Sequence, residues 1–374
     1  MLISNTKAIV KELLALADIN INGSRPWDIQ VHDERVYEAV LRKKILGFGE
    51  SYTEGWWDCA ELDNCITRLV RAELEYKLKD RPGLKLSILA NRLLNFQTRD
   101  RSLEVAQKHY DLGNDLFQCM LDENMMYSCG YWKSANNLTQ AQIDKLELVC
   151  KKLNLAPGMR LLDIGCGWGG LAKFAAENYG VRVVGVTISQ QQAELARQRC
   201  KDLPIEIRLQ DYRELNEQFD RIASIGMFEH VGYKNYRHYM QVVKRCLAPE
   251  GLFLLHTLGS NISVVKGQNE WLAKYIFPNG MLPSIKQLGA SFEKLFVMED
   301  WQNFGAYYHP TLMSWHERFN QHWEQLKTKY GEQFRRLWNF YLLSCAGGLQ
   351  GRDCQVWQIV LSHNGIDGVY HSAR

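Results

Sequence analysis

A cluster of glycines near the middle of the chain follows a short apolar segment. Residues 160–164 precede GCGWGG at 165–170, and an amphipathic segment then runs to Gly180, where a second apolar run begins. Glycines allow a ligand to approach the backbone closely, and the first turn of the following helix offers unpaired N–H groups. This order of strand, loop, helix and strand predicts a nucleotide-type binding site.

The glycine loop satisfies G-x-G-x-x-G, a pattern that does not by itself identify the ligand. Asp163, two residues before the first glycine, discriminates better. A carboxylate there suits a cation such as the sulfonium and ammonium groups of S-adenosylmethionine, and it would repel a pyrophosphate. The second strand, 181–188, ends without the Asp or Glu of a nicotinamide site, which leaves Ser189 and Gln192 for the ribose. We therefore favour S-adenosylmethionine; a purely structural glycine turn is the alternative.

The alternation of apolar and amphipathic segments from about residue 145 predicts a doubly wound α/β sheet. The expected strands are 160–164, 181–188, 205–209, 221–225 and 251–258, and the expected helices are 168–179, 190–202 and 234–247. Residues 1 to about 110 are instead typical of helices. The tail contains an apolar run at 295–298, two aromatic-rich helices and a final strand, CQVWQIVLSH. We expect a smaller helical domain at 1–110 and an α/β domain at 111–374.

Composition restricts the class of protein. The 374 residues are 46% hydrophobic and 23% charged, which indicates a folded protein with a large core, and no apolar stretch reaches the ~20 residues that span a bilayer. A net charge of +3 does not indicate nucleic-acid binding. Ten cysteines without C-x-x-C, and the absence of H-E-x-x-H, argue against a metal site and favour a reducing cytoplasm.

A basic stretch occupies residues 77–108, with eight Lys or Arg side chains against three acidic ones. Within it, LKLSILANRLLNF places Leu86, Leu89, Leu93 and Phe96 on one helical face. A basic amphipathic helix of this kind suits an anionic membrane surface. The alternative is a helix packed on its own protein with a solvated basic rim.

Nine stretches spread along the chain are specific when taken together. They are KHYDLGNDLF (108–117), MMYSCGYW (125–132), LDIGCGWGGLA (162–172), VVGVTIS (183–189), GMFEHVG (226–232), FLLHTLGS (253–260), YIFPNGMLPS (275–284), MEDWQNFGAYY (298–308) and SCAGGLQGRD (344–353). In these stretches the chain resembles the bacterial cyclopropane-fatty-acyl-phospholipid synthases. The resemblance implies a helical lipid- and membrane-binding domain at 1–110 and a Rossmann-like class I methyltransferase domain at 111–374. It also implies a cytoplasmic enzyme, peripheral on the inner face of the cell membrane.

The resemblance implies methylene transfer from S-adenosylmethionine to the cis double bond of unsaturated phospholipid acyl chains. The alkene attacks the sulfonium methyl, and the resulting carbocation closes to a cyclopropane when the new methyl group loses a proton. Aromatic faces can stabilise such a cation by roughly 1–2 kcal/mol each when desolvated. Twelve aromatic residues lie between Trp301 and Tyr341, among them Tyr307, Tyr308, Trp315, Phe319 and Trp323. One or two of the twelve, facing the alkene, would suffice to stabilise the cation, and most of the others are expected to serve packing.

In this family a bound bicarbonate ion takes that proton. The resemblance implies that its ligands are Cys129, Glu229, His256, Tyr308 and the backbone N–H of Leu258. His256 and Tyr308 can donate hydrogen bonds to the anion, and Glu229 can accept its O–H. Without the resemblance, Glu229 and the adjacent His230 would be equal candidates, and Cys129 would be interpreted as a buried thiol.

The resemblance also implies a set of cofactor-binding residues. Tyr127 and Ser128 match positions at the methionine end of the cofactor. The other expected positions are Asp163, Gly165, Cys166, Gly167, Gly169, Thr187, Ile188, Ser189, Gln192, Asp211 and Tyr212, with Asp211 near the adenine edge. Cys345, in SCAGG, matches a family cysteine that has been assigned to the active site, although no step above requires a second thiol and a structural role is equally compatible.

Three hypotheses remain open from the sequence. The first is the lipid cyclopropane synthase. The second is a methyltransferase with the same half-reaction that acts on a small molecule or leaves a methyl branch on an acyl chain. The third is a non-catalytic membrane module, which the complete set of Cys129, Glu229, His256 and Tyr308 opposes. A homodimer is one assembly that the sequence leaves open.

Overall fold

The computed structural model describes residues 2–77, 112–265 and 269–374. The chain divides into two compact units, and neither is a single continuous segment. The first unit comprises 1–113, 269–278 and 315–353; the second comprises 114–268, 279–314 and 354–374. The first boundary lies close to the expected one at residue 110. The two later segments were expected in the catalytic domain, but they cluster with the N-terminal residues.

The first unit is helical. It contains α1 (Leu2–Leu16), α2 (Arg35–Thr53), α3 (Leu62–Arg71), α4 (Leu74–Lys77), α11 (Glu270–Tyr275) and α14 (Trp323–Gln350), with the short strands β1 (Gln30–Val31) and β2 (Trp57–Asp58). Close helix crossings explain why the later segments belong here. A Cβ at Gly347 of α14 would lie 2.3 Å from the Asp63 carbonyl oxygen on α3, and one at Gly49 of α2 would lie 2.5 Å from Trp271 of α11. Only glycine permits such approaches.

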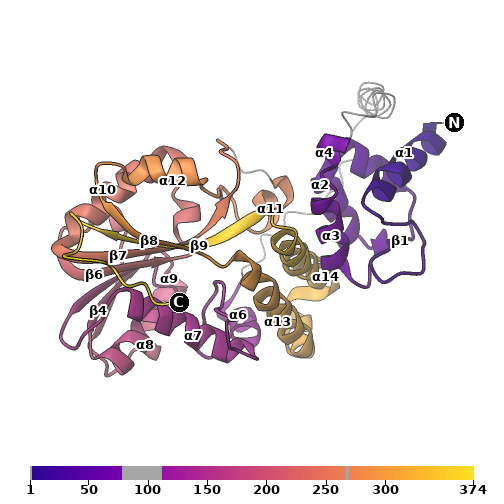
Figure 1. Ribbon diagram of the computed structural model, residues 1–374. Helices are drawn as coiled ribbons and strands as arrows, with labels where there is room; N and C mark the ends of the chain where they lie inside the picture. The colour runs from indigo at the N-terminus through magenta and orange to yellow at the C-terminus, as the bar shows by residue number, and fades with distance from the viewer. Residues whose placement is uncertain (1, 78–111, 266–268) are drawn as a thin grey trace. The chain divides into compact units, whose positions relative to one another are not determined.

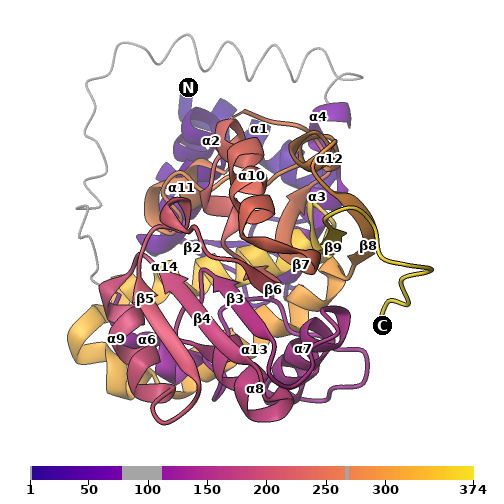
Figure 2. The ribbon, with the colours of Figure 1, turned by 90° about the vertical axis from the view of Figure 1, so that its left-hand side faces the viewer.

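The second unit is built on a seven-stranded sheet. Its strands are β3 (Arg160–Ile164), β4 (Arg182–Thr187), β5 (Ile205–Leu209), β6 (Phe219–Ile225), β7 (Leu247–Ser260), β8 (Val297–Asn303) and β9 (Cys354–Ser362). Figure 2 shows them in the order β5-β4-β3-β6-β7-β9-β8. Strand β9 is antiparallel to both neighbours, and the other adjacent pairs are parallel. The strand order reverses at β3 and β6, the switch point where ligands bind in open α/β sheets.

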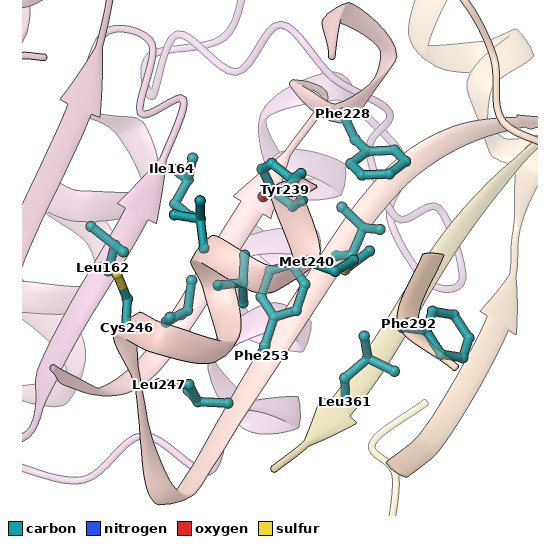
Figure 3. Packing of buried hydrophobic residues seen from close by; sticks show 14 of the residues in the cluster. Leu162, Ile164, Phe228, Tyr239, Met240, Cys246, Leu247, Phe253, Phe292 and Leu361 are labelled. Carbon is teal, nitrogen blue, oxygen red and sulfur yellow. The ribbon is translucent and has the colours of Figure 1, made fainter. Parts of the chain in front are cut away.

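Helices cover both faces of this sheet, as the doubly wound prediction required. Helices α10 (Tyr236–Cys246) and α12 (Ile285–Phe292) lie on one face, and α7 (Leu138–Lys152) and α8 (Gly170–Tyr179) lie on the other (Figure 1). Successive residues of a strand point to opposite faces. Accordingly Leu162 packs with Phe253 beneath α10 (Figure 3), whereas Leu161 belongs to the cluster formed with α7 and α8. The expected strands and helices of the α/β part are confirmed, with shifted ends.

The remaining elements of the second unit are shorter. They are α6 (Asn114–Met120), α9 (Gln190–Arg199), and the 3₁₀ turns η2 (Tyr212–Glu214), η3 (Phe228–His230), η4 (Tyr233–Asn235) and η5 (Gly305–Tyr307); α13 (Tyr308–Gln321) begins in this unit and ends in the first. Across the described ranges, no helix has the length and apolar character needed to cross a bilayer. The basic amphipathic segment LKLSILANRLLNF lies outside the described residues.

Candidate active site

The glycine loop lies at the carboxyl end of β3, at the switch point of the sheet. Gly165, Gly167 and Gly169 have φ values of 81°, 53° and 80°, in the left-handed region that glycine adopts without strain. The N–H groups of Gly165 and Cys166 both donate to the Val186 carbonyl, at 2.9 and 3.0 Å, which fixes the loop against β4. A Cβ at Gly167 would meet no atom within 4 Å, so the loop leaves open space for a ligand there.

Asp163 is the last but one residue of β3, and its side chain is only 2% exposed. Its Oδ2 has no hydrogen-bond partner among the described residues. Burial raises the pKa of this carboxyl to about 7, and the nearby Lys145 ammonium acts in the opposite direction. A buried carboxylate with an unpaired oxygen fits a cationic ligand, since the cation would hold the carboxylate in its charged form.

Lys145 of α7 connects two of the expected cofactor residues. Its side chain is fully buried, and its Nζ donates to Ser128 Oγ at 3.0 Å. Gln142, one turn earlier, donates to the Ser128 carbonyl at 2.8 Å. Burial lowers the pKa of Lys145 to about 8, against the attraction of Asp122, Cys129 and Asp163. The lysine therefore places its charge between the Ser128 segment and Asp163.

The carboxyl end of β4 supplies the next group of expected cofactor residues. Thr187 Oγ1 donates to Gln192 Oε1 at 2.9 Å, and Ser189 caps α9 by accepting from the Gln192 N–H. Ile188, between them, is 80% exposed. The chain thus presents an apolar contact beside fixed polar groups.

Asp211 and Tyr212 follow β5. Asp211 caps η2 and pairs with Arg213 at 2.5 Å, which lowers the pKa of its carboxyl. The Tyr212 ring meets Tyr239 edge-on at 5.1 Å. The Asp211 carboxylate is therefore already neutralised by a neighbouring guanidinium in this structure. Tyr127 packs against Phe117, whose ring also contacts Trp168 of the loop at 4.9 Å.

Glu229 lies in η3, just beyond the end of β6. Its Oε1 accepts a hydrogen bond from the Leu258 N–H at 2.7 Å, and its Oε2 is unpaired within the part of the chain that the structure describes. Burial raises the pKa of this carboxyl to about 7. His230 beside it is exposed, so the structure separates two residues that the sequence left equivalent.

His256 lies on β7, next to β6, and is 3% exposed. Its carbonyl accepts from the Gly226 N–H at 2.9 Å, which joins the ends of the strands that carry His256 and Glu229. Burial, together with the charges of Lys145 and Lys152, holds the pKa of the imidazole well below 6.5, so the ring is neutral at neutral pH. Its face meets the ring of Phe304 at 5.6 Å, and Phe304 in turn contacts Tyr131.

Cys129 and Tyr308 are joined through α13. Thr311 Oγ1 accepts from the Gly130 N–H at 3.1 Å and from Trp132 Nε1 at 2.8 Å, which ties the Cys129 segment to the first turn of α13. Tyr308 begins that turn, three residues before Thr311 and so on the same side of the helix. The Cys129 thiol is fully buried, and burial raises its pKa well above the ordinary value, so it is a neutral donor.

Cys345 belongs to α14 in the first unit, whereas Cys129, Glu229, His256 and Tyr308 all belong to the second. Burial raises the pKa of the Cys345 thiol to about 12. A thiolate nucleophile at neutral pH is therefore not supported at this position. Trp315, Phe319 and Trp323 also lie in the first unit, all buried, and Phe319 packs against Trp323 and Phe334. These aromatic side chains serve packing, as expected for most of the group.

Sequence reasoning did not identify Lys145, Lys152 or Gln358. The two lysines lie seven residues apart on α7, which places both on one helical face, and both side chains are fully buried. The sequence could have indicated these two lysines, because both lie on the apolar face of a helix and lysine is rarely buried without a function or a partner.

Comparisons with known proteins show the family of this chain. The family described as "Mycolic acid cyclopropane synthetase" matches residues 97–359. The cyclopropane-fatty-acyl-phospholipid synthase of Escherichia coli K12 is 53% identical over 370 residues, covering 99% of this chain and 96% of that protein. The structure of a cyclopropane synthase from Mycobacterium tuberculosis has a TM-score of 0.63 and 31% identity, covering 67% of this chain and 95% of that one.

A mycolic acid cyclopropane synthase solved with SAH and CTAB matches with the same TM-score, identity and coverage. Coclaurine N-methyltransferase bound to N-methylheliamine and SAH, at 22% identity and a TM-score of 0.67, shares the fold. The family match and the full-length identity show that this chain belongs to the cyclopropane-fatty-acyl-phospholipid synthase family of S-adenosylmethionine-dependent methyltransferases.

Proposed function

We propose that this chain transfers a methylene group from S-adenosylmethionine to the cis double bond of unsaturated phospholipid acyl chains, forming a cyclopropane ring. The observation that carries the proposal is a pair of buried carboxyls at the carboxyl edge of one sheet. Asp163 fits a cation, and Glu229, which follows the strand paired with that of the neutral His256, fits an anion that carries an O–H. A reaction that passes from a sulfonium to a carbocation and then loses a proton needs both functions.

S-adenosylmethionine supplies the one-carbon group on a positively charged sulfur. In this proposal the backbone of Gly165–Gly169 lies against the cosubstrate, and the Asp163 carboxylate offers its unpaired oxygen to a positive charge. Lys145 orients Ser128 through its 3.0 Å hydrogen bond and, by its charge, favours the ionised form of Asp163. The exposed Ile188 side chain provides an apolar surface beside the loop.

A bound bicarbonate ion supplies a weak base for the proton that leaves the new methyl group. The residues present fit such an ion: Glu229 Oε2 is buried and unpaired over the described ranges, and neutral His256 carries one N–H to donate. Two buried ammonium groups, Lys145 and Lys152, make the potential at His256 positive, which favours an anion.

Leu258 differs from the expectation in one respect. Its N–H already donates to Glu229 Oε1 at 2.7 Å. In this arrangement Leu258 fixes the Glu229 carboxylate, and a direct contact with the anion would require that hydrogen bond to be exchanged. Cys129 and Tyr308 remain proposed donors. The Cys129 S–H already donates to the Gly130 carbonyl at 3.3 Å, so it too would have to exchange a hydrogen bond to contact the anion.

A methyl-branched product is the second candidate. The tuberculostearic acid methyltransferase of Mycobacterium tuberculosis is 31% identical over 352 residues, covering 87% of this chain. A relative named for a different acyl-chain product keeps this outcome open.

The test uses purified enzyme, S-adenosylmethionine and vesicles of mono-unsaturated phospholipid. We expect lipids heavier by one CH₂ that lack olefinic protons and show cyclopropane protons by NMR, and we expect the rate to fall when bicarbonate is removed. The matched control is His230→Gln, which changes the exposed neighbour of Glu229 and should leave the product unchanged. Added carbon with a retained double bond would support the branched product, and no transfer would contradict both candidates.

We also propose that residues 77–108 hold the enzyme on the cytoplasmic face of the membrane. Lys77, at the start of this basic stretch, donates to the Leu16 carbonyl at the end of α1 and keeps an exposed side chain. Each Lys or Arg near an anionic surface contributes about 1 kcal/mol to binding, and salt screens this attraction beyond a Debye length.

Replacing Lys77, Lys79, Arg99 and Arg101 by Gln should weaken binding to anionic vesicles in a flotation assay, as added salt should for the parent chain. Equal loss of activity on detergent-dispersed lipid would contradict this role.

A further inference from the structure

Three polar side chains lie side by side across the sheet of the second unit. His256 on β7 is the register partner of Gln358 on β9, and Gln358 is the register partner of Gln302 on β8. Cross-strand partners project from the same face of a sheet. Gln358 is fully buried in the middle of this row. A buried amide costs free energy unless it makes hydrogen bonds, and Gln358 Oε1 has no partner among the described residues, so the burial of this side chain calls for a reason.

Gln302, at one end of the row, is held by α7 and by Tyr131, to whose hydroxyl its Nε2 donates at 3.4 Å. Lys152 Nζ lies 2.6 Å from Gln302 Oε1 and 3.1 Å from Asp300 Oδ2. An ammonium can only donate, so Lys152 fixes which end of the Gln302 amide faces it. At the other end of the row, Gln358 Nε2 lies 3.3 Å from His256 Nδ1.

The contact with Gln358 determines where the imidazole proton resides. His256 is neutral, because burial and the two lysine charges disfavour its protonation. A neutral imidazole has one N–H and one acceptor nitrogen. When the Gln358 amide N–H donates to Nδ1, Nδ1 is the acceptor and the proton lies on Nε2. Nε2 is the ring nitrogen turned away from Gln358, where a donor is available to a ligand.

We propose that Gln358 is a positioning residue that holds His256 in the Nε2–H tautomer, so that the imidazole presents a hydrogen-bond donor to the anion of the proposed reaction. The inference rests on the proposed function for the identity of the anion, but the tautomer itself does not depend on it. The opposite tautomer would present a lone pair to the anion, and that lone pair would repel it.

The experiment combines histidine-selective ¹⁵N NMR with kinetics. In the parent enzyme the His256 signals, assigned by their loss in His256→Gln, should show a protonated Nε2 and an unprotonated Nδ1. Gln358→Met keeps the side-chain length and removes the donor. It should yield a mixture of tautomers and lower kcat about ten- to hundredfold, the size typical of residues that orient a functional histidine. The KM for S-adenosylmethionine should stay unchanged.

Gln358→Glu is the second variant. A carboxylate can only accept, so it should pull the proton onto Nδ1 and raise the pKa of the imidazole, which would move the acidic limb of the pH–rate profile to higher pH. Gln355 provides the matched control: it is a buried glutamine on the same strand, three residues away and thus on the opposite face, and its Oε1 accepts from Asn303 at 3.1 Å. Gln355→Met should leave the His256 signals and kcat unchanged.

A protonated Nδ1 in the parent enzyme would overturn the inference. So would an unchanged kcat in Gln358→Met, or equal losses in Gln358→Met and Gln355→Met, which would indicate general packing. If the enzyme makes no cyclopropane but the tautomer changes as expected, the proposed function fails and the positioning role stands. Thermal unfolding of each variant shows which of them are folded.

Discussion

The two ends of the candidate site bury a carboxyl in a similar way but are assembled differently. Asp163 and Glu229 each follow or end a central strand, each has one oxygen without a partner among the described residues, and burial raises the pKa of each to about 7. Asp163 lies close to the charge of Lys145, whereas Glu229 accepts from the uncharged Leu258 N–H. The surroundings, rather than the carboxyls themselves, suit one to a cationic cosubstrate and the other to an anion.

The largest expected effect is a fall in kcat, without a change in cosubstrate affinity, when Glu229 is replaced. Glu229→Gln keeps an acceptor for the Leu258 N–H but removes the negative oxygen that would hold an O–H. We expect kcat to fall by about 10²–10⁴, the usual contribution of groups that manage a proton transfer. S-adenosylmethionine affinity, measured by calorimetry, should not change. His230→Gln is the control, and loss of cosubstrate affinity in Glu229→Gln would mean that the two ends are not separate.

Asp163→Asn should have the opposite pattern. A hydrogen bond to a charged group contributes about 1.5–3 kcal/mol, so S-adenosylmethionine affinity should fall about ten- to hundredfold. With saturating cosubstrate, kcat should fall much less than in Glu229→Gln. Calorimetry at pH 8, where Asp163 of the parent is ionised, gives the comparison. Unchanged affinity would remove the argument that this carboxylate binds a cation.

The same variant has a consequence for stability without cosubstrate. The pKa of Asp163 is raised on folding from its ordinary value of 3.8 to about 7, so the folded state loses stability as pH rises between these two values and loses no more above them. Asn cannot ionise. The free energy of unfolding of Asp163→Asn should therefore exceed that of the parent at pH 8, and the difference should shrink as pH falls from about 7 toward the ordinary pKa of 3.8. A variant less stable than the parent at pH 8 would show that the carboxylate supports the fold.

The proposed cosubstrate end could be named from local sequence because its residues are nearly contiguous. Asp163, the glycines and Gln192 lie within one strand–helix–strand–helix segment, and the turn chemistry of glycine fixes their geometry. Glu229, His256 and Cys129 could be named only by resemblance, since they come from separate elements. Their grouping depends on adjacent strands and on Thr311 of α13.

The features that sequence reasoning missed depend on long-range packing. Strand β8 was visible only as a short apolar run, because most of Val297–Asn303 is polar and its neighbour β9 comes more than fifty residues later. Gln358 lay within a correctly expected strand, but its partner His256 is set by sheet register. The assignment of the later segments to the first unit was missed for the same reason. Gly49 and Gly347 allow close contact between helices that are distant in the sequence.

The smallest expected effect concerns the pH dependence of cosubstrate binding. Only the ionised form of Asp163 attracts a cation, so affinity should fall, at most about tenfold per pH unit, as pH drops below about 7. The charge of Lys145 lowers the pKa of Asp163, and Lys145→Met should therefore move the midpoint of the affinity curve to higher pH. That variant also loses the hydrogen bond to Ser128, which weakens binding at every pH, so the midpoint and not the absolute affinity is the relevant measurement.

Calorimetry between about pH 5.5 and pH 7.5 covers the range in which Lys145, with its pKa of about 8, is mostly charged. Asp163→Asn should show no such midpoint; if it does, another group titrates with the ligand and the contrast between the two buried carboxyls loses its electrostatic basis.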